Sequence, residues 1–576
     1  MQTTKTQEAA VARAMLDGFE THYGLMQQTG RAAKGFFEAQ DWNALRRLQS
    51  ERIGWYDTRV VECVERLTKE FPPEVFTDAR WGDVKLAYVA LLLEHRQPEL
   101  AEVFFNSVTT RVLHRTYFQN RFMFVRPSVS TEYLDLWEPS YRCYYPARTG
   151  LRTTLKKLVL DFGLSRPYAD LDRDVNHVVR ALRLAMPRPL VVEPNFQLQV
   201  LESLFFRGQE AYVVGRAFNG LSMAPFVVPI VHDGRGRLVL DAVLLDPKLL
   251  AILFSSTRAY FLADIDVPST WVHFLRRMLP TKPPWELYAM LGFGKASKAL
   301  FYRDFLHHLR HSTDLLTLAP GTAGLVMVVF TLPSFPYVFK LIRDRPKPPK
   351  DVTPAQVKER YRLVKRADRA GRMADTLEYS EVAIPKARLS PELLDELRRE
   401  VPQQLTEEGD AVVFQHVYIE RRMKPLDLAL RAASDAELEH LVDDFGHCMK
   451  ELAAANVFAG DLLYKNFGVT RLGRVIFYDY DEVETVTQVN FRELPKARDD
   501  EDDWRGEAWF QVGPHDVFPE EWRPFLFTDE RVKRVLEARH PELFEAAWWR
   551  KVKASLESGR PVRVTPYPDT VRFAPR

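Results

Sequence analysis

The chain has 576 residues and a mass of 66.8 kDa, which is too long for one compact domain and predicts at least two hydrophobic cores. Hydrophobic residues make up 46% of the sequence and charged residues 27%, and this composition excludes disordered, collagen-like and membrane-embedded proteins. The 80 Lys and Arg residues against 78 Asp and Glu leave a net charge of +2, so we expect no global electric field that attracts nucleic acid or an anionic membrane.

The cysteines and the N-terminus indicate a cytoplasmic protein. Cys63, Cys143 and Cys448 lie far apart in the sequence, which excludes a C-x-x-C metal site and argues against a disulfide framework. Residues 1–19 contain no uninterrupted apolar stretch that could serve as a secretory signal. No other apolar run approaches the length that spans a bilayer. We therefore expect a cytoplasmic protein with neither nucleic-acid nor membrane partners.

The first 200 residues carry mainly helical patterns. Val11, Met15, Phe19 and Tyr23 recur at steps of four, which is typical of the buried face of an amphipathic helix. Asp41 is placed to cap the helix that follows. These apolar faces predict helices that pack on one another rather than on a ligand.

A β-rich segment interrupts the helices between Ala211 and Leu245. Two apolar runs, residues 226–231 and 238–245, flank the sequence Asp-Gly-Arg-Gly at 233–236, which is a strong hairpin signal. Helical patterns then return until residue 311, where we place the domain boundary. The predicted fold class is therefore α+β, with a mainly helical N-terminal domain that contains a small β-meander.

The second part of the chain opens with a loop, a strand, a turn and another strand. The strand at 325–332 follows a glycine-bearing loop, and the strand at 337–342 carries Lys340 among apolar neighbours. Glycines let backbone N–H groups approach phosphate oxygens. Protein kinases have a comparable order, in which a strand lysine behind a glycine loop pairs with the phosphates of ATP. The candidate nucleotide-binding residues of the loop are Ala319, Pro320, Gly321, Thr322, Ala323, Gly324 and Leu325.

Two charged stretches are predicted to be exposed loops. Residues 343–350 are rich in proline, which is excluded from a helix interior. Residues 499–503 are acidic, and like charges disfavour packing. We expect both stretches to be solvated connectors.

Three oxygen-bearing side chains have the spacing of a kinase catalytic site. Asp461 and Asn466 match D-x-x-x-x-N, and a predicted hairpin at 467–478 places Asp479 just past the end of an apolar strand. Phosphoryl transfer needs a carboxylate that orients the attacking hydroxyl and accepts its proton, and hard oxygen ligands for Mg²⁺. The alternative is that these residues cap turns and end a strand in solvent. The glycine loop and Lys340 upstream favour the catalytic interpretation.

The sequence also departs from protein kinases. Ala459-Gly460 stands where kinases have His-Arg, so an arginine that receives an activation-loop phosphate is absent. Asp479-Tyr480-Asp481 replaces D-F-G and adds a second carboxylate. The lysine that kinases carry two residues after the catalytic aspartate is missing, and Lys465 lies at another offset. The partner of Lys340 stays open among Glu359, Glu378 and Glu381.

Longer stretches carry a specific resemblance that covers nearly the entire chain. They are residues 319–321, 338–340, 371–376 (Gly-Arg-Met-Ala-Asp-Thr), 418–423 (Tyr-Ile-Glu-Arg-Arg-Met), 460–461, 465–470 and 477–482. In these stretches the sequence resembles the isocitrate dehydrogenase kinase/phosphatase family. The resemblance implies a regulatory domain at residues 1–311 and a bilobal protein-kinase-like domain at residues 312–576.

The resemblance also implies the activity. It implies a bacterial enzyme that uses ATP and Mg²⁺ to phosphorylate a serine of isocitrate dehydrogenase, and that removes the phosphate again at a shared site. This control divides flux between the tricarboxylic acid cycle and the glyoxylate bypass. AMP is implied as an allosteric effector, an intrinsic ATPase activity is expected, and a homodimer is one assembly that the resemblance leaves open.

Residue roles follow from the same resemblance. Lys340 would bind phosphates, Asp461 would orient the serine hydroxyl, and Asn466 and Asp479 would hold Mg²⁺. Asp375 matches an active-site carboxylate, a role that spacing does not predict. Because phosphoryl transfer depends mostly on positioning and charge, Asp375 or Asp481 could orient a water molecule for hydrolysis. Glu420 and Met423 fit the hinge that contacts adenine, although the charged residues there could equally form a surface ion-pair network.

Two other functions remain open at this point. A kinase-like phosphotransferase that acts on a small-molecule alcohol would share the same acidic residues. A catalytically silent scaffold is disfavoured by the joint presence of Lys340, Asp461, Asn466 and Asp479. Residues 489–522 are a candidate docking region for a folded protein substrate, with Trp504, Trp509 and Phe510 as anchors, unless these aromatic residues only pack the lower lobe.

Overall fold

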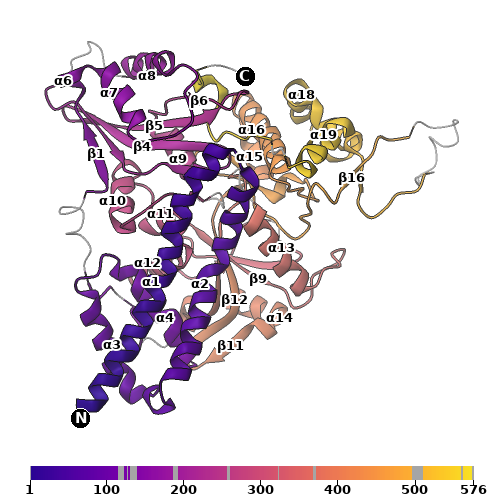
Figure 1. Ribbon diagram of the computed structural model, residues 1–576. Helices are drawn as coiled ribbons and strands as arrows, with labels where there is room; N and C mark the ends of the chain where they lie inside the picture. Colours follow the sequence, from indigo (N-terminus) through magenta and orange to yellow (C-terminus); the bar gives the residue numbers. More distant parts are fainter. Residues whose placement is uncertain are drawn as a thin grey trace.

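The computed structural model describes most of the chain (Figure 1). The described residues are 2–114, 122–125, 127–129, 139–185, 193–255, 260–321, 323–367, 371–495, 510–527, 529–559 and 562–573. Thr322, Trp504, Trp509 and the acidic run 499–503 lie outside them. Within the described ranges, no helix combines the length and the apolar character needed to cross a membrane.

Four helices begin the chain and form the first core. They are α1 (Gln2–Ala39), α2 (Trp42–Glu70), α3 (Asp78–Leu92) and α4 (Pro98–Val112). Figure 1 shows α1 and α2 side by side over much of the length of the molecule. Val11, Met15 and Phe19 of α1 are buried against α3 and α4, as the steps of four predict. Asp41 caps α2 by accepting a hydrogen bond from Ala44 N at 2.9 Å, which confirms the predicted helix start.

A six-stranded antiparallel sheet follows, with order β1-β2-β4-β5-β6 and β3 paired to β4. Its strands are β1 (Tyr141–Tyr144), β2 (Gln197–Leu201), β3 (Phe205–Arg207), β4 (Glu210–Asn219), β5 (Ser222–His232) and β6 (Leu238–Leu240). The predicted hairpin is β5–β6, and its turn is closed by a hydrogen bond from Gly236 N to Asp233 O at 3.0 Å. The sheet is larger than a small meander, because β1 and β2 add strands to its other edge.

The two faces of this sheet are covered by different helices. Val213 faces a core that includes α7 (Leu151–Leu160) and α8 (Leu171–Ala185), and Tyr212 faces the core of α1 and α10 (Pro268–Met278). A strand that is buried on both faces reads as a continuous apolar run. Beyond the sheet, α9 (Pro247–Leu253), α11 (Pro284–Met290) and α12 (Gly294–His311) lead to the second half of the chain.

A second six-stranded antiparallel sheet forms the upper lobe of the candidate kinase region. Its order is β10-β12-β9-β8-β7, with β11 paired to β12. The strands are β7 (Thr317–Leu318), β8 (Met327–Thr331), β9 (Tyr337–Ile342), β10 (Thr376–Pro385), β11 (Leu405–Glu408) and β12 (Ala411–Arg421). Trp285, Phe301 and Phe305 of α11 and α12 pack on one face of this sheet together with α14 (Pro391–Glu400), while α13 (Pro354–Ala367) packs into the lower core.

The lower lobe is mainly helical. Its elements are β13 (Lys424–Pro425), α15 (Leu426–Ala432), α16 (Asp435–Ala454), β14 (Phe467–Val469), β15 (Val475–Phe477), β16 (Asn490–Phe491), β17 (Asp516–Val517), α18 (Glu530–Arg539) and α19 (Ala546–Glu557). The predicted hairpin at 467–478 is β14–β15, which pairs antiparallel with β13. This hairpin sits against α16 through Phe445 and Phe467, whose ring centroids are 4.8 Å apart.

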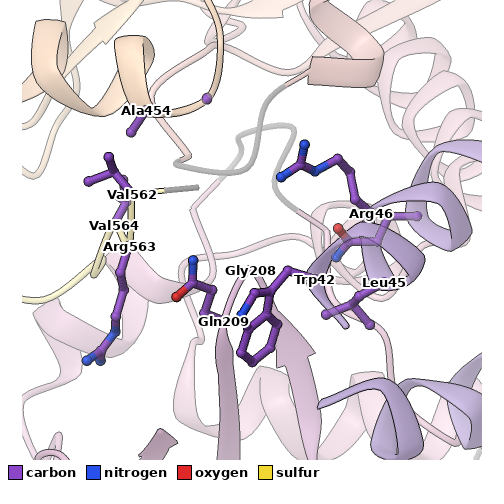
Figure 2. Close-up of a pocket in the computed structure, with 11 residues that line it drawn as sticks. Trp42, Leu45, Arg46, Gly208, Gln209, Ala454, Val562, Arg563 and Val564 are labelled. Atoms are coloured by element: carbon purple, nitrogen blue, oxygen red, sulfur yellow. The ribbon is translucent and has the colours of Figure 1, made fainter. Parts of the chain in front are cut away.

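The C-terminal segment returns to the first half of the molecule. Arg563 binds Glu210 at 2.7 Å and Asp241 at 2.9 Å, and Arg572 Nε lies 3.1 Å from Asp241 Oδ2. Tyr567 Oη also donates to Asp241 at 2.9 Å. Figure 2 shows the start of this segment, Val562 to Val564, beside Trp42 and Gln209. The segment therefore ties the lower lobe to the first sheet.

The stretch 343–350 is a loop, as predicted, but only part of it is exposed. Arg343 is 1% exposed, and its guanidinium pairs with Glu396 at 3.3 Å and with Glu400. Arg343 N donates to Val326 O, so the strand pairing of β8 and β9 continues into this stretch and carries the side chain inward. Two acidic residues of α14 satisfy the charge, which the local sequence does not reveal.

Candidate active site

Lys340 is buried and paired with Glu420. The Nζ atom lies 2.9 Å from Glu420 Oε2, with side-chain exposures of 7% and 1%. Strands β9 and β12 are neighbours, with Lys340 opposite Tyr418 and Glu420 opposite Val338, so the two side chains meet diagonally on one face of the sheet. None of the three glutamates considered from the sequence makes this pair. Glu359 is exposed and pairs with Arg362 at 3.2 Å.

The same lysine reaches the lower lobe. Lys340 Nζ donates to Tyr478 O at 3.2 Å and lies 5.1 Å from the centre of the Tyr478 ring. Tyr478 immediately precedes Asp479, so the strand lysine and the metal-ligand candidate lie at the same end of hairpin β14–β15. This contact joins the two lobes through residues that sequence spacing predicts to act together.

Asp479 and Asp481 form a hydrogen-bonded carboxyl pair. Burial, followed by the hydrogen bond and charge of Asp481, raises the pKa of Asp479 well above its ordinary value. Burial acts to raise the pKa of Asp481 as well, but the hydrogen bond from Asp479 and the charge of Lys350 outweigh it and lower that pKa. Two neighbouring carboxyl groups repel each other when both are ionised. A divalent cation would relieve this repulsion, so the oxygens of this pair fit a Mg²⁺ site chemically.

Asn466 and Asp461 lie beside this pair. Asn466 Nδ2 donates to Asp461 O at 3.1 Å, and Tyr478 N donates to Asn466 O at 3.2 Å. The amide nitrogen is thereby engaged, and the oxygen Oδ1 is the atom that would coordinate a cation. The carboxylate of Asp461 accepts a hydrogen bond from Leu463 N at 3.2 Å, which orients it at the surface of the lower lobe.

Gly460 explains one departure from protein kinases. Its φ is 72°, and a Cβ atom at this position would lie 2.2 Å from Glu482 O. Only glycine fits a left-handed conformation with backbone packed so closely. An arginine at position 460 is therefore sterically excluded, and the short approach places Asp461 next to the segment that carries Asp481.

Lys350 is a member of this site that sequence reasoning missed. Its Nζ lies 3.5 Å from Asp481 Oδ2 and 3.9 Å from Asp461 Oδ2, and it also pairs with Glu482. The stretch 343–350 was expected to be solvated, and a lysine in a proline-rich loop carries no local signal of a catalytic contact. We call the boundary between the two lobes at this point the cleft, and its acidic cluster comprises Lys340, Lys350, Glu420, Asp461, Asn466, Asp479, Asp481 and Glu482.

The glycine loop lies at the upper edge of this cluster. Ala319 N donates to Val329 O at 2.9 Å, and Gly321 has a φ of 116°. A Cβ atom on Gly324 would lie 2.8 Å from Met327 O, so glycine permits the tight entry into β8. Lys347 N donates to Leu325 O at 2.9 Å, which attaches the Lys350 segment to the loop.

Glu420 and Met423 lie where the chain passes from the upper to the lower lobe. Glu420 is in β12, and its carboxylate is engaged by Lys340 rather than turned to the surface. Met423 lies against β14, because a Cβ atom on Gly468 would be 2.8 Å from the Met423 Cβ. The position of this crossing segment is compatible with a nucleotide hinge.

Asp375 faces a cavity between the two halves of the chain. Tyr260 Oη donates to Asp375 Oδ1 at 2.8 Å, while Ala374 N donates to Phe477 O at 3.0 Å. The backbone of this segment thus runs beside hairpin β14–β15, and the carboxylate points to a cavity of about 460 Å³. The cavity lining combines cationic and aromatic side chains, namely Arg52, Lys295, Lys298, Lys365, Tyr56, Tyr260 and Phe293.

The lysines of this cavity repel one another. Burial, and then the charges of Lys295 and Lys365, lower the pKa of Lys298 to about 7. The Lys298 ammonium donates to Glu378 O at 2.7 Å, and Lys295 pairs with Asp57 at 2.8 Å. An anionic ligand would relieve this repulsion. The proximity of these lysines could not be predicted from the sequence, because Lys295 and Lys298 belong to α12 and Lys365 belongs to α13.

A group of potential metal ligands lies away from the cleft. Single ligand atoms of Asp443, His447 and His540 lie within 4.8 Å of one another. His540 Nε2 is 3.0 Å from Asp443 Oδ1, and Arg539 Nη1 is 3.2 Å from Asp443 Oδ2. The carboxylate is already balanced by the guanidinium, so we assign this group a structural role that joins α16 to α18.

Phe510 is the docking candidate that the structure describes. Its ring lies 5.3 Å from that of Phe518, and the Arg492 guanidinium lies 5.9 Å from its centre. Nearby, Trp522 and Trp549 pack edge to face at 5.5 Å in the lower lobe. These contacts give Phe510 a packing role, and substrate docking at this surface remains a prediction.

Two family models and several relatives match the chain. The model of the isocitrate dehydrogenase kinase/phosphatase (AceK) regulatory domain matches residues 12–313, and the model of the AceK kinase domain matches residues 314–569. Relatives with the name isocitrate dehydrogenase kinase/phosphatase are 52% identical in Burkholderia multivorans, 50% in Paraburkholderia xenovorans and 48% in Aromatoleum aromaticum. Each alignment covers 98% of this chain and 93–95% of the relative.

Proposed function

Because this chain belongs to the isocitrate dehydrogenase kinase/phosphatase family, we propose that it phosphorylates a serine of isocitrate dehydrogenase with ATP and also removes that phosphate. The contact that carries the proposal is the one between Lys340 Nζ and Tyr478 O, at 3.2 Å. It brings a strand lysine of the upper lobe to the edge of the carboxyl pair of the lower lobe. This is the arrangement that phosphoryl transfer needs.

Each side chain of the cleft has a proposed task. Lys340, oriented by Glu420, binds phosphate oxygens, and the glycine loop donates backbone N–H groups to them. Asp461 orients the serine hydroxyl and accepts its proton. Asn466 and Asp479 hold Mg²⁺, which neutralises phosphate charge when it is bound. Glu420 and Met423 belong to the hinge segment beside adenine.

Hydrolysis needs a water molecule in line with the phosphoserine. We propose that a carboxylate orients this water, and Asp375 and Asp481 are the candidates. Asp481 is hydrogen-bonded to Asp479, and Asp375 is held by Tyr260. The same positioned water would also account for an intrinsic ATPase activity.

AMP is the proposed allosteric effector, and residues 1–311 are the proposed regulatory domain. The cavity that Asp375 faces has a volume of about 460 Å³ and contains both lysines and aromatic rings. Lysines suit the phosphate of a nucleoside monophosphate, and aromatic rings suit its base. A ligand there would contact both α12 and the segment that runs beside hairpin β14–β15, so its binding can alter the cleft.

Two further proposals concern the state of the protein in the cell. The three cysteines are unpaired, which supports a reducing cytoplasm as its location. A homodimer is the assembly to test, and light scattering of the purified protein at several concentrations measures it directly.

One experiment tests the proposed function. Purified protein is incubated with radiolabelled ATP, Mg²⁺ and isocitrate dehydrogenase, and incorporation and release of phosphate are followed with and without AMP. A parallel panel of small-molecule alcohols tests the alternative substrate class. Label in isocitrate dehydrogenase that is later released supports the proposal, and label in an alcohol alone contradicts it.

A further inference from the structure

A lysine from an unexpected segment enters the acidic cluster of the cleft. Lys350 Nζ lies between Asp461 and Asp481, at 3.9 Å and 3.5 Å from their nearest carboxylate oxygens, and it pairs with Glu482. Its side chain is 16% exposed, so the ammonium lies in the cleft rather than in bulk solvent.

The backbone that carries Lys350 is anchored to the glycine loop. Lys347 N donates to Leu325 O at 2.9 Å, and Lys350 N donates to Lys347 O at 3.1 Å. Arg343 Nε donates to Gly324 O at 3.2 Å at the other end of the segment. Lys350 is therefore held between the loop that would cover the phosphates and the carboxylate that would receive the serine proton.

The catalytic loop itself offers no lysine at the position that kinases use. The residue two positions after Asp461 is Leu463, and Lys465 is exposed. Phosphoryl transfer spreads negative charge over the oxygens of the moving group, and a cation beside the acceptor stabilises that charge. Burial acts to lower the pKa of Lys350, but the hydrogen bond to Glu482 and the charges of the surrounding carboxylates have the larger effect. The net pKa is raised, so the amine is charged.

We propose that Lys350 binds the γ-phosphoryl group of ATP and takes the place of the missing catalytic-loop lysine; this inference rests on the proposed kinase function. In the transfer, the serine oxygen forms a bond to the γ-phosphorus, and the bond from the γ-phosphorus to the β,γ-bridging oxygen breaks. ADP leaves with that electron pair, and the serine proton passes to Asp461. Lys350 exchanges its carboxylate partners for phosphoryl oxygens and neither gains nor loses a proton.

A comparison of ATP with ADP isolates a γ-phosphate contact. Calorimetry measures the affinity of Lys350→Met for each nucleotide. We expect its affinity for Mg²⁺-ATP to fall about 10-fold, because one charge-assisted contact is lost. Its affinity for Mg²⁺-ADP should be unchanged, because ADP has no γ-phosphate. Single-turnover phosphorylation of isocitrate dehydrogenase should fall about 100-fold. Lys350→Arg should recover part of both losses. Lys347→Met is the matched control, because Lys347 lies in the same segment and its side chain pairs with Glu400 at 3.3 Å; it should behave as wild type.

Three outcomes overturn the inference. In the first, Lys350→Met loses affinity for ATP and ADP equally. In the second, Lys350→Met loses affinity for neither nucleotide. In the third, Lys465→Met, and not Lys350→Met, loses affinity for ATP alone. If Lys350→Met does not fold, as judged by its melting temperature, Lys350→Gln carries the same comparison. If wild-type protein does not phosphorylate isocitrate dehydrogenase, the proposed function fails, but the ATP-to-ADP comparison still decides the role of Lys350.

Discussion

Replacing Glu420 by glutamine should destabilise the upper lobe far more than a loss of one hydrogen bond would. The change keeps the shape of the side chain but leaves the Lys340 ammonium, which is 7% exposed, without its carboxylate. Breaking a buried ion pair by removing one partner costs about 3–5 kcal/mol. Because the Tyr478 carbonyl still accepts from Lys340 at 3.2 Å, we expect the lower end of this range, about 3 kcal/mol.

Urea unfolding followed by tryptophan fluorescence measures this effect. The double variant Lys340→Met/Glu420→Gln should be more stable than Glu420→Gln alone, because it no longer buries an unpaired charge. Glu407→Gln is the control, since Glu407 pairs with Lys386 and Arg398 at the surface of the same sheet; because exposed ion pairs contribute little to stability, its loss should be far smaller. A Glu420→Gln protein as stable as the Glu407→Gln control would show that this ion pair does not stabilise the upper lobe.

Other predictions follow from single features of the structure. Gly460→Ala should reduce both activities and stability by about 2 kcal/mol or more, because a Cβ atom would lie 2.2 Å from a backbone oxygen; a melting curve and a kinase assay check it, and wild-type behaviour would contradict it. Asp241→Asn should cost about 3 kcal/mol, because two arginines of the C-terminal segment lose their common anion; limited proteolysis should then release that segment. AMP affinity should fall as the pH rises from 6 to 8, because Lys298, whose pKa is lowered to about 7, loses its charge over that range; calorimetry that shows constant affinity would argue against AMP in this cavity. Asp375→Asn should reduce phosphate release by about 10-fold more than phosphate incorporation, and equal losses would exclude Asp375 as the water-orienting group.

The parts of the fold that could be predicted from the sequence depend on local patterns. The strand 337–342 and the hairpin at 467–478 are set by alternation and by a glycine turn, and both occur as predicted. The convergence of Asn466 and Asp479 follows from that hairpin, since the two residues flank its ends. Short-range geometry of this kind is available to sequence reasoning because few residues separate the partners.

Two partners of the cleft could not be predicted because they depend on long-range arrangement. Glu420 meets Lys340 because β12 lies next to β9, and a sequence without its strand order cannot reveal this pair. Lys350 comes from a proline-rich segment whose charges were expected to be solvated. Its position follows from backbone hydrogen bonds to the glycine loop, and its contacts cross from the upper to the lower lobe.

The contact between Tyr260 and Asp375 has the same origin. The two residues are separated by 115 positions, and nearby α12 contacts β10 through Lys298, Glu378 and Tyr379. Asp375 gives no spacing signal, and its role was implied only by the resemblance. Its location at the interdomain cavity is the basis of the proposed link between AMP binding and hydrolysis.

We propose that transfer and hydrolysis share one cleft. The most direct measurement compares wild type with Asp479→Asn for incorporation of phosphate into purified isocitrate dehydrogenase and for its release from the phosphorylated form. We expect Asp479→Asn to lose both activities together, while its melting temperature without nucleotide changes little. Retention of either activity at the wild-type rate would contradict a shared site.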